Sequence, residues 1–170
     1  VLCPSVIAAL PFAKRMHWGD GDFAFARPIR WMLALLGDTV VPFEIGKVTS
    51  GRTTQGHRVL GPGPFTIKTA SEYVPTIVNE GKVQLKACER REYIVGEGNR
   101  IAEAAGGRII WIESLLDEVQ GLVECPVPLL GDFDPSFLEL PREVLLTSMQ
   151  EHQKSFGVED AQGNLLPHFL

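Results

Sequence analysis

Apolar and polar positions follow no single period along this chain; helical spacings and strand-like apolar runs interleave irregularly. Short β-prone runs bounded by turn residues predict strands over residues 16–18, 23–25, 31–36, 39–45, 64–67, 82–85, 108–111, 127–130, 155–159 and 165–170. Helical spacing and capping residues predict helices over 4–10, 69–79, 87–105 and 114–123, and a last helix that begins at Pro141. This order predicts an α+β fold, with a mixed, mostly antiparallel sheet, hairpins and several packed helices, rather than a doubly wound nucleotide-binding fold.

Residues 31–45 allow two interpretations. Residues 31–36 are apolar at every position, Gly37-Asp38 follows, and residues 39–45 are rich in β-prone types, which favours two strands joined by a two-residue hairpin turn. Pro42 has no N–H to donate, so it marks an edge or a bulge in the second strand. The alternative is a helix from Pro28 to Gly37, because the period of a short apolar run does not separate helix from strand.

The longest predicted helix, over residues 87–105, contains Gly96 and Gly98. Each glycine disfavours a helix by about 1 kcal/mol relative to Ala, so we expect a kink or a break there. Gly106-Gly107 is typical of a helix C-terminus. In the next helix, Ser114 is the expected cap, and one apolar face is formed by Leu115, Leu116, Val119, Leu122 and Val123.

The last helix aligns apolar positions at spacings of four and three, and His152 falls on the same stripe as Met149 and Phe156. We therefore predict a hydrogen-bonded core histidine at this position. Residues 155–170 predict a hairpin around a glycine-bearing loop. Pro167 makes its second strand an expected edge strand.

Composition indicates a globular protein. With 170 residues, 45% of them hydrophobic, the chain has enough apolar surface for a packed core, and we predict a single α+β domain over residues 1–170. The first residue is not Met and the last residues fall inside a strand-like run, so we expect a piece of a longer protein. No apolar run approaches the roughly 20 residues of a membrane span, and the N-terminal pattern is not that of a signal peptide.

The chemistry of the cysteines points to a reducing, cytoplasmic setting. Cys3, Cys88 and Cys125 are odd in number and far apart, and no CxxC pair supports a zinc site or a disulfide framework. His17, Asp20 and Asp22 offer too few oxygen ligands for a hard cation, so we interpret this segment as a turn and expect no metal. No GxSxG elbow is present, and we expect no catalytic residue in this chain.

Charge is unevenly distributed. The net charge is −5, yet residues 14–58 hold seven Lys/Arg and four Asp/Glu, whereas residues 59–170 hold nine and seventeen. The first third is therefore the expected surface for any polyanion. Within it, the loop Gly51–Gly63 carries Arg52, His57 and Arg58 beside threonine hydroxyls, which suits phosphate binding, although a solvated basic loop is the plain alternative. It does not fit the GxxxxGK[ST] pattern of a P-loop.

A family resemblance rests on several separate motifs in order along nearly the whole chain. These are Met16-His17-Trp18-Gly19, Phe25-Ala26-Arg27-Pro28-Ile29-Arg30-Trp31, Gly51-Arg52-Thr53-Thr54, Gly56-His57-Arg58, the block from Met149 to Phe156 and the block from Gly163 to Phe169. Together they resemble the beta subunit of the bacterial two-subunit glycyl-tRNA synthetase. The resemblance implies an alpha2beta2 tetramer with an alpha subunit that holds ATP and Mg, a beta subunit that binds tRNA(Gly), a cytoplasmic location, and no cofactor in this fragment.

From the resemblance and the charge pattern together, the expected tRNA-contacting residues are Lys14, Arg15, Arg30, Arg52, His57, Arg58, Gln153 and Lys154. Two alternatives stay open. A looser likeness to the beta subunit of phenylalanyl-tRNA synthetase suggests an editing-like aminoacyl-tRNA hydrolase module, with a pocket lined by His57 or His152. The other alternative is a purely structural subunit-interface domain, which would expose an apolar patch and show no salt-dependent affinity for tRNA.

Overall fold

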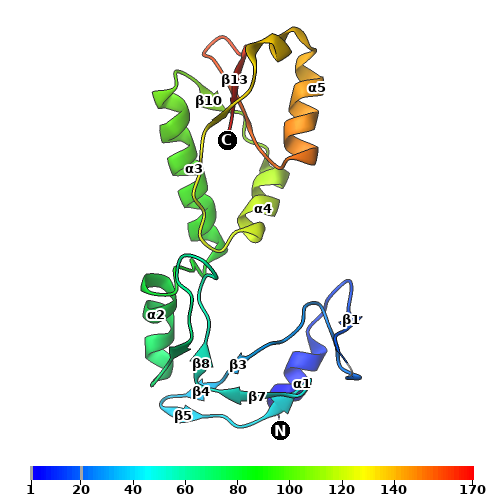
Figure 1. Cartoon of the computed structure of the whole chain (residues 1–170), viewed down its shortest axis with the longest axis vertical. Coiled ribbons are helices and arrows are strands. Elements are labelled where there is room, and N and C mark those ends of the chain that lie inside the picture. The colour runs from blue at the N-terminus through cyan, green and yellow to red at the C-terminus, as the bar shows by residue number, and fades with distance from the viewer. Residues whose placement is uncertain (1, 20) are drawn as a thin grey trace. The chain divides into compact units, whose positions relative to one another are not determined.

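The structure, a computed structural model, describes residues 2–19 and 21–170. The chain divides into two compact units, which we name the N-terminal unit (Val1–Val83) and the C-terminal unit (Gln84–Leu170), whereas the sequence analysis treated residues 1–170 as a single domain. Each unit combines helices with mostly antiparallel strands, which confirms the predicted α+β class (Figure 1).

The N-terminal unit is built from many very short strands. Its elements are α1 (Leu2–Ala9), β1 (Met16–His17), β2 (Ala24–Phe25), β3 (Met32–Leu33), β4 (Leu35–Leu36), β5 (Thr39–Val40), β6 (Glu44–Ile45), β7 (Val48–Gly51), β8 (Thr53–Thr54), β9 (Phe65–Thr66), a 3-10 turn (Ala70–Glu72) and α2 (Tyr73–Asn79). The pairs β1–β2, β4–β5, β6–β7 and β8–β9 are antiparallel, and β3 runs parallel to β7. The predicted 16–18/23–25 pair is thereby confirmed.

The hairpin interpretation of residues 31–45 is confirmed and the helical alternative is wrong. Leu36 pairs with Thr39 across the Gly37-Asp38 turn, and Pro42 lies between two strands rather than within one. A second hairpin was not predicted. It turns at Gly46 and Lys47, whose φ angles of 55° and 65° match the primed turns that suit the twist of paired strands.

The strand predicted over residues 82–85 is wrong, because these residues form no ladder. Lys82 has a φ of 54°, which takes the chain out of the extended conformation. The buried apolar residues of the N-terminal unit are few: Ile45, Ile67 and Ile77.

The C-terminal unit holds the longer helices and one continuous sheet. Its elements are α3 (Ala87–Ala104), β10 (Arg108–Ile109), α4 (Glu113–Leu122), β11 (Gly131–Asp132), a 3-10 turn (Pro135–Glu139), α5 (Arg142–Thr147), a π-helical turn (Ser148–His152), β12 (Gly157–Glu159) and β13 (Leu165–Phe169). The sheet order is β10-β12-β13-β11, antiparallel throughout, and α3 packs against α4 and β10 (Figure 1).

The core of this unit explains why α3 does not break. α3 runs without interruption through Gly96 and Gly98, so the predicted break is wrong. A Cβ on Gly98 would lie 2.7 Å from Leu170 Cδ2 and 3.0 Å from Trp111 Cη2. The glycine therefore provides room for tight packing, and burial of the Trp111 side chain outweighs its low helix propensity.

Three predicted details of the α4 region are wrong. α4 begins at Glu113, so Ser114 lies inside the helix rather than at its cap. Leu122, assigned to the apolar face, is 66% exposed. Residues 127–130 form no strand, and β11 begins instead at Gly131.

Two predictions for the last third are also wrong. His152 is exposed, not a core residue, because the π-helical turn shifts the positions after Met149 off the apolar stripe. Pro167 lies in a central strand rather than an edge strand. It is accommodated because the β12–β13 register shifts between Gly157 and Glu159, while its carbonyl accepts from Phe133 N (3.1 Å).

Candidate nucleic-acid interface

Lys14, Arg30 and Arg58 are three of the five exposed cations among the predicted tRNA-contacting residues. Within the described part of the chain, none of the three side chains donates a hydrogen bond or joins an ion pair. A surface Lys or Arg without a carboxylate partner keeps its full charge for an approaching polyanion. These three residues therefore offer the N-terminal unit's most accessible positive charge among the predicted set.

Arg15 and Arg52 lie close to backbone carbonyls and hold local structure. Arg15 donates to Ala8 O (3.1 Å) and to Leu10 O at the end of α1. Arg52 donates to Lys68 O (3.2 Å) and to Asp38 O (3.1 Å), which joins the β4–β5 turn to the residues after β9. Carbonyls are neutral and a guanidinium has five N–H donors, so both side chains keep their charge and spare donors.

The His57 side chain stabilises the backbone of its own loop. Its Nδ1 accepts hydrogen bonds from the backbone N–H groups of Val59 (3.2 Å) and Leu60 (3.0 Å), and its backbone N–H donates to Gly81 O (2.7 Å). In the neutral ring the proton must then sit on Nε2, which leaves Nε2 as a donor rather than a base. His57 thus shapes the loop that carries Arg58.

The same loop is held by close backbone contact. A Cβ on Gly56 would lie 2.3 Å from Gly61 O and 2.5 Å from Gly81 Cα, so only glycine fits where the loop meets the residues after α2. Beyond this contact the loop turns outward, and Val59 is 76% exposed. The Gly56-His57-Arg58 motif therefore presents Arg58 on a fixed loop.

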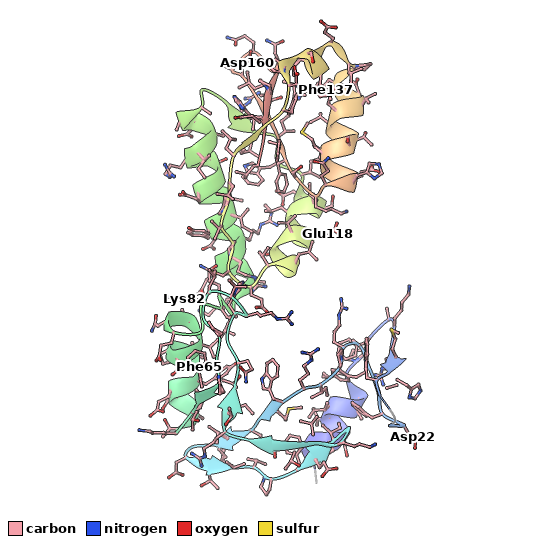
Figure 2. The ribbon with its side chains drawn as sticks, in the orientation of Figure 1. Asp22, Phe65, Lys82, Glu118, Phe137 and Asp160 are labelled. Carbon is pink, nitrogen blue, oxygen red and sulfur yellow. The ribbon has the colours of Figure 1, made fainter. Side chains whose placement is uncertain are left out.

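The remaining two candidates, Gln153 and Lys154, lie in the C-terminal unit and are both exposed. Lys154 Nζ lies 2.9 Å from Glu118 Oε2 on α4, and Figure 2 labels Glu118 on that helix. Gln153 borders an apolar cavity of about 350 Å³ beside Phe137 and Val144. The structure thus does not bring these two residues together with the loop of Arg58 in one compact unit.

The two units differ in how many ion pairs they contain. Seven ion pairs and the His168–Asp132 hydrogen bond join side chains in the described part of the chain, and all of them lie within the C-terminal unit. By sequence the N-terminal unit holds nine Lys/Arg and six Asp/Glu, against seven and fifteen in the C-terminal unit. The N-terminal unit therefore has a net charge of +3 and no ion pair among its described side chains, whereas the C-terminal unit pairs six of its seven Lys/Arg with carboxylates.

Glu159 is the clearest case of local compensation. Its Oε2 lies 2.6 Å from Arg142 Nη2 and its Oε1 lies 2.8 Å from Arg108 Nη2, and its side chain is only 14% exposed. Hydrogen bonding from Arg142, followed by that from Arg108, lowers the pKa of the Glu159 carboxyl. Both arginines are thus occupied in joining β10, α5 and β12.

The described residues do not form the nucleophile–histidine pair that the hydrolytic alternative would need. Across residues 2–19 and 21–170, no Ser, Thr or Cys side chain is hydrogen-bonded to a histidine ring. His57 Nδ1 is already used by backbone N–H groups, and His152 is exposed. A nucleophile activated by an adjacent base is therefore not formed in the described structure.

No group of three or more His, Cys, Asp and Glu side chains gathers in the described residues in a way that would hold a metal ion. Asp20, part of the segment interpreted as a turn, lies outside the described residues. No helix in the part of the chain that the structure describes is both long enough and apolar enough to cross a bilayer.

Sequence reasoning missed two features of the C-terminal unit. His168 Nδ1 and Asp132 Oδ1 lie 2.6 Å apart as cross-strand partners of β13 and β11, and Asp132 lies outside the predicted strands. An apolar surface also went unpredicted: Phe137, Leu140 and Val144 are 51%, 46% and 54% exposed around the 350 Å³ cavity. Their clustering around a short 3-10 turn carries no periodic signal.

The comparisons with known proteins all point to one protein family. The family model described as "Glycyl-tRNA synthetase beta subunit" matches residues 1–170. The chain is 66% identical over 168 residues to the glycine–tRNA ligase beta subunit of Nitratidesulfovibrio vulgaris (strain DSM 19637 / Miyazaki F), and this match covers 99% of the chain and 24% of that relative. The corresponding proteins of Lawsonia intracellularis and Moorella thermoacetica are 49% and 45% identical over 99% and 98% of the chain, and 24% of each relative. The chain thus spans about a quarter of the length of the curated relatives it matches.

Proposed function

Because the chain belongs to the glycyl-tRNA synthetase beta subunit family, we propose that it forms a non-catalytic part of a glycine–tRNA ligase. In this role it supports tRNA(Gly) binding and the assembly of an alpha2beta2 tetramer, and it contributes to glycyl-tRNA synthesis in the cytoplasm. The alpha subunit holds ATP and Mg and forms the bonds. The beta subunit contributes geometry, because a small misplacement of the acceptor end costs orders of magnitude in rate.

One observation carries the tRNA-binding part of the proposal. The N-terminal unit keeps exposed cations without carboxylate partners, whereas every ion pair in the described residues lies in the C-terminal unit. Phosphate contacts from Lys and Arg supply most of the non-specific affinity for nucleic acid. Lys14, Arg30 and Arg58 are the residues with which the phosphate chain would pair first.

The other predicted residues have secondary parts in this proposal. Arg15, Arg52 and His57 fix the local backbone and offer their spare donors to sugar and phosphate groups. Gln153 and Lys154 stay candidates, and Lys154 would have to leave Glu118 to reach a phosphate. Their expected contributions to affinity are smaller for that reason.

The assembly part of the proposal rests on the apolar surface of the C-terminal unit. Phe137, Leu140 and Val144 expose about half of their surface around one cavity, and contiguous exposed apolar groups mark interaction sites. This surface is the one we assign to subunit contact. It also accommodates the structural-interface alternative, which differs from the proposal only in denying that the N-terminal unit contacts tRNA.

The experiment uses the complete alpha–beta enzyme with the combined variant Lys14→Gln, Arg30→Gln and Arg58→Gln. Each lost phosphate contact removes a favourable electrostatic interaction, so we expect tRNA(Gly) affinity to fall about ten- to hundredfold near 0.1 M salt. Fluorescence anisotropy of labelled tRNA gives the Kd. Light scattering of the same samples checks that the tetramer forms, and an unchanged Kd in an intact tetramer would leave only the structural-interface alternative.

A further inference from the structure

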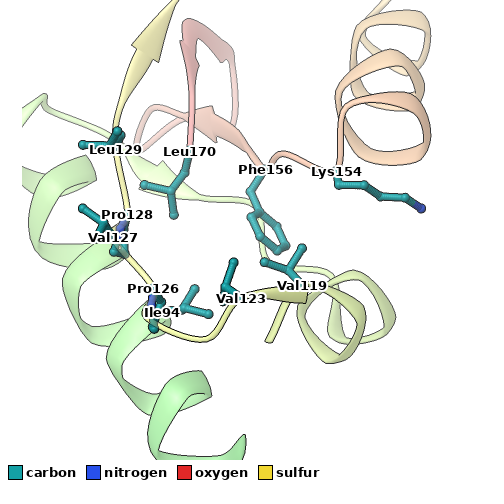
Figure 3. A pocket seen from close by; sticks show the side chains of 10 residues that line it. All are labelled: Ile94, Val119, Val123, Pro126, Val127, Pro128, Leu129, Lys154, Phe156 and Leu170. Atoms are coloured by element: carbon teal, nitrogen blue, oxygen red, sulfur yellow. The ribbon is translucent and has the colours of Figure 1, made fainter. Parts of the chain in front are cut away.

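Residues 126–130 form an unpaired segment that leads directly into β11. None of the backbone hydrogen bonds found between described residues uses an N–H or C=O of this segment. Val127 and Leu129 are 62% and 72% exposed, whereas the intervening Pro128 is half-buried and Pro126 is buried. Figure 3 shows the segment along one side of a cavity, with Leu170 beside it. The period-two burial is that of a strand with one buried face, although no other described segment pairs with it.

The pairing of β11 with β13 fixes which way each backbone group points. Gly131 pairs with Phe169 and Asp132 with His168, and Phe133 N donates to Pro167 O (3.1 Å). In an antiparallel ladder, alternate residues direct both backbone groups to the same neighbour. Since the odd-numbered residues of β11 face β13, continuing the strand backward would direct the backbone groups of Val127 and Leu129 to the same side.

The prolines fall on the opposite edge. By the same alternation, Pro126 and Pro128 direct their backbone away from the line of β13, and neither has an N–H to donate. Prolines on an outer edge prevent unwanted strand addition. The segment is therefore blocked on its outer edge and fully equipped with donors and acceptors on its inner edge.

β13 itself still pairs at its last described residue. Leu170 N donates to Phe156 O (2.8 Å) and Phe156 N donates to Leu170 O (2.9 Å), so strand geometry continues to Leu170 on the β12 side. A Cβ added at Gly131 would lie 2.4 Å from the Phe169 ring, so only glycine fits opposite this side chain. The contact fixes the register of β11 against β13. The relatives are about four times as long as this chain, so the family's polypeptide has residues outside this structure.

We propose that the inner edge of residues 127–130 is occupied by the same polypeptide, as an antiparallel extension of β13 past Leu170. The register of β11 and β13 assigns the partners. The first residue after Leu170 lies opposite Leu129 and the third lies opposite Val127, both as hydrogen-bonded pairs. The second residue lies opposite Pro128 as a non-hydrogen-bonded pair.

The cavity beside the segment defines the chemistry of the added strand. It has a volume of about 270 Å³ and is lined mostly by apolar side chains, among them Ile94, Pro128, Phe156 and Leu170 (Figure 3). Side chains of a strand alternate between faces, so the second residue after Leu170 shares the face of Leu170. That residue is apolar and covers the cavity, while its two neighbours cover Val127 and Leu129 on the other face.

Hydrogen exchange in the complete, unmodified beta subunit gives the first test. A hydrogen-bonded amide exchanges its hydrogen only when its strand pairing opens. We therefore expect the Val127 and Leu129 amides to exchange at least about 100-fold more slowly than in an unstructured peptide. Exchange at the rate of an unstructured peptide would overturn the proposal. Protection that appears only after the alpha subunit is added would assign the edge to another chain and overturn it equally.

A disulfide in the complete beta subunit tests the register. In a background with Cys3→Ser, Cys88→Ser and Cys125→Ser, the variant Pro128→Cys is combined with a cysteine at the second position after Leu170. Non-hydrogen-bonded antiparallel pairs lie about 4.5 Å apart at Cα, within disulfide range. We expect oxidation to form the intramolecular bridge in most molecules.

The matched control moves the second cysteine to the first position after Leu170, where its Cβ points to the opposite face. We expect the bridge to form at least about tenfold less in this control. Equal bridging in both variants, or none in either, would overturn the proposed register. The inference is independent of the proposed tRNA binding, because neither test measures RNA affinity.

Discussion

The two units differ in where their polar groups find partners and in how much apolar surface they bury. The C-terminal unit buries a contiguous cluster that includes Ile94, Leu116, Phe156 and Val158, and pairs its surface charges internally. The N-terminal unit buries three isoleucines, and only Arg15 and Arg52 among its arginines donate to backbone carbonyls in the described residues. The larger buried core and the unpaired positive charge therefore lie in different units of this chain. The unit with the weaker core is the one with cations available to a polyanion.

The strands reflect the same division. In the C-terminal unit a four-stranded sheet shares one buried cluster with residues of α3 and α4, whereas most strands of the N-terminal unit have two residues and pair only locally. Short strands contribute little burial, so this unit depends on turns and side-chain-to-carbonyl contacts such as those of Arg52. Substitutions of buried residues in the two units should therefore differ in size and in which property they change.

The largest expected effect is on the core of the C-terminal unit. Phe156 is 2% exposed and its ring lies 4.8 Å from that of Trp111, so Phe156→Ala should lower the free energy of unfolding by about 3–5 kcal/mol. Urea denaturation of the complete subunit measures it. Phe137, 51% exposed, is the matched control, and Phe137→Ala should change stability by less than about 1 kcal/mol. Equal effects would contradict the assignment of the core.

A smaller loss is expected in the N-terminal unit at Gly56. The Cβ of Gly56→Ala would meet Gly61 O at 2.3 Å, so the loop must shift, which we expect to destabilise the subunit by about 1–3 kcal/mol and to weaken tRNA binding through Arg58. Thermal unfolding and Kd are measured together. Gly96→Ala is the control, because its Cβ meets nothing within 4 Å and better helix propensity should add about 0.5–1 kcal/mol. A Gly56→Ala variant as stable as wild type would refute the tight contact.

The smallest effect is the pH dependence of Glu159. Arg142 and Arg108 hold the pKa of the Glu159 carboxyl below its usual range. Its stabilising contribution is therefore complete above the carboxyl's unfolded-state pKa and is lost as pH falls through the folded-state pKa. Glu159→Gln should cost about 1–2 kcal/mol at pH 7, and this difference should shrink in acid. Glu103→Gln, an exposed substitution on α3, is the control and should change the free energy of unfolding by less than about 0.5 kcal/mol at pH 7. A pH-independent loss in Glu159→Gln would contradict the ion-pair explanation.

Much of the fold was predictable where one signal dominates locally. The Gly37-Asp38 turn predicted its hairpin, and Gly106-Gly107 predicted the end of α3. The failures occur where tertiary contacts override a local rule. Gly98 serves packing with Trp111 rather than a break, and the π-helical turn moves His152 off its stripe.

The candidate site was predictable only in part. Sequence showed that the first third is basic, but not which cations already have partners. In the sequence, Arg52 and Lys14 are both basic residues of the same region. Only the structure shows that Arg52 donates to Lys68 O whereas the Lys14 ammonium group is exposed. The strand predicted over 127–130 failed in the structure, although its period-two pattern is present there without a partner strand.

The most direct test of the central claim compares how salt weakens tRNA(Gly) binding in two triple variants of the complete alpha–beta enzyme. One variant removes Lys14, Arg30 and Arg58; the other removes cations that are ion-paired in the C-terminal unit, Lys86, Arg100 and Arg108, all as Gln substitutions. We expect the first variant to reduce the slope of log K against log salt by about 2–3 and the second to leave it unchanged. Equal slopes in the two variants would contradict the claim that the N-terminal unit presents the available positive charge.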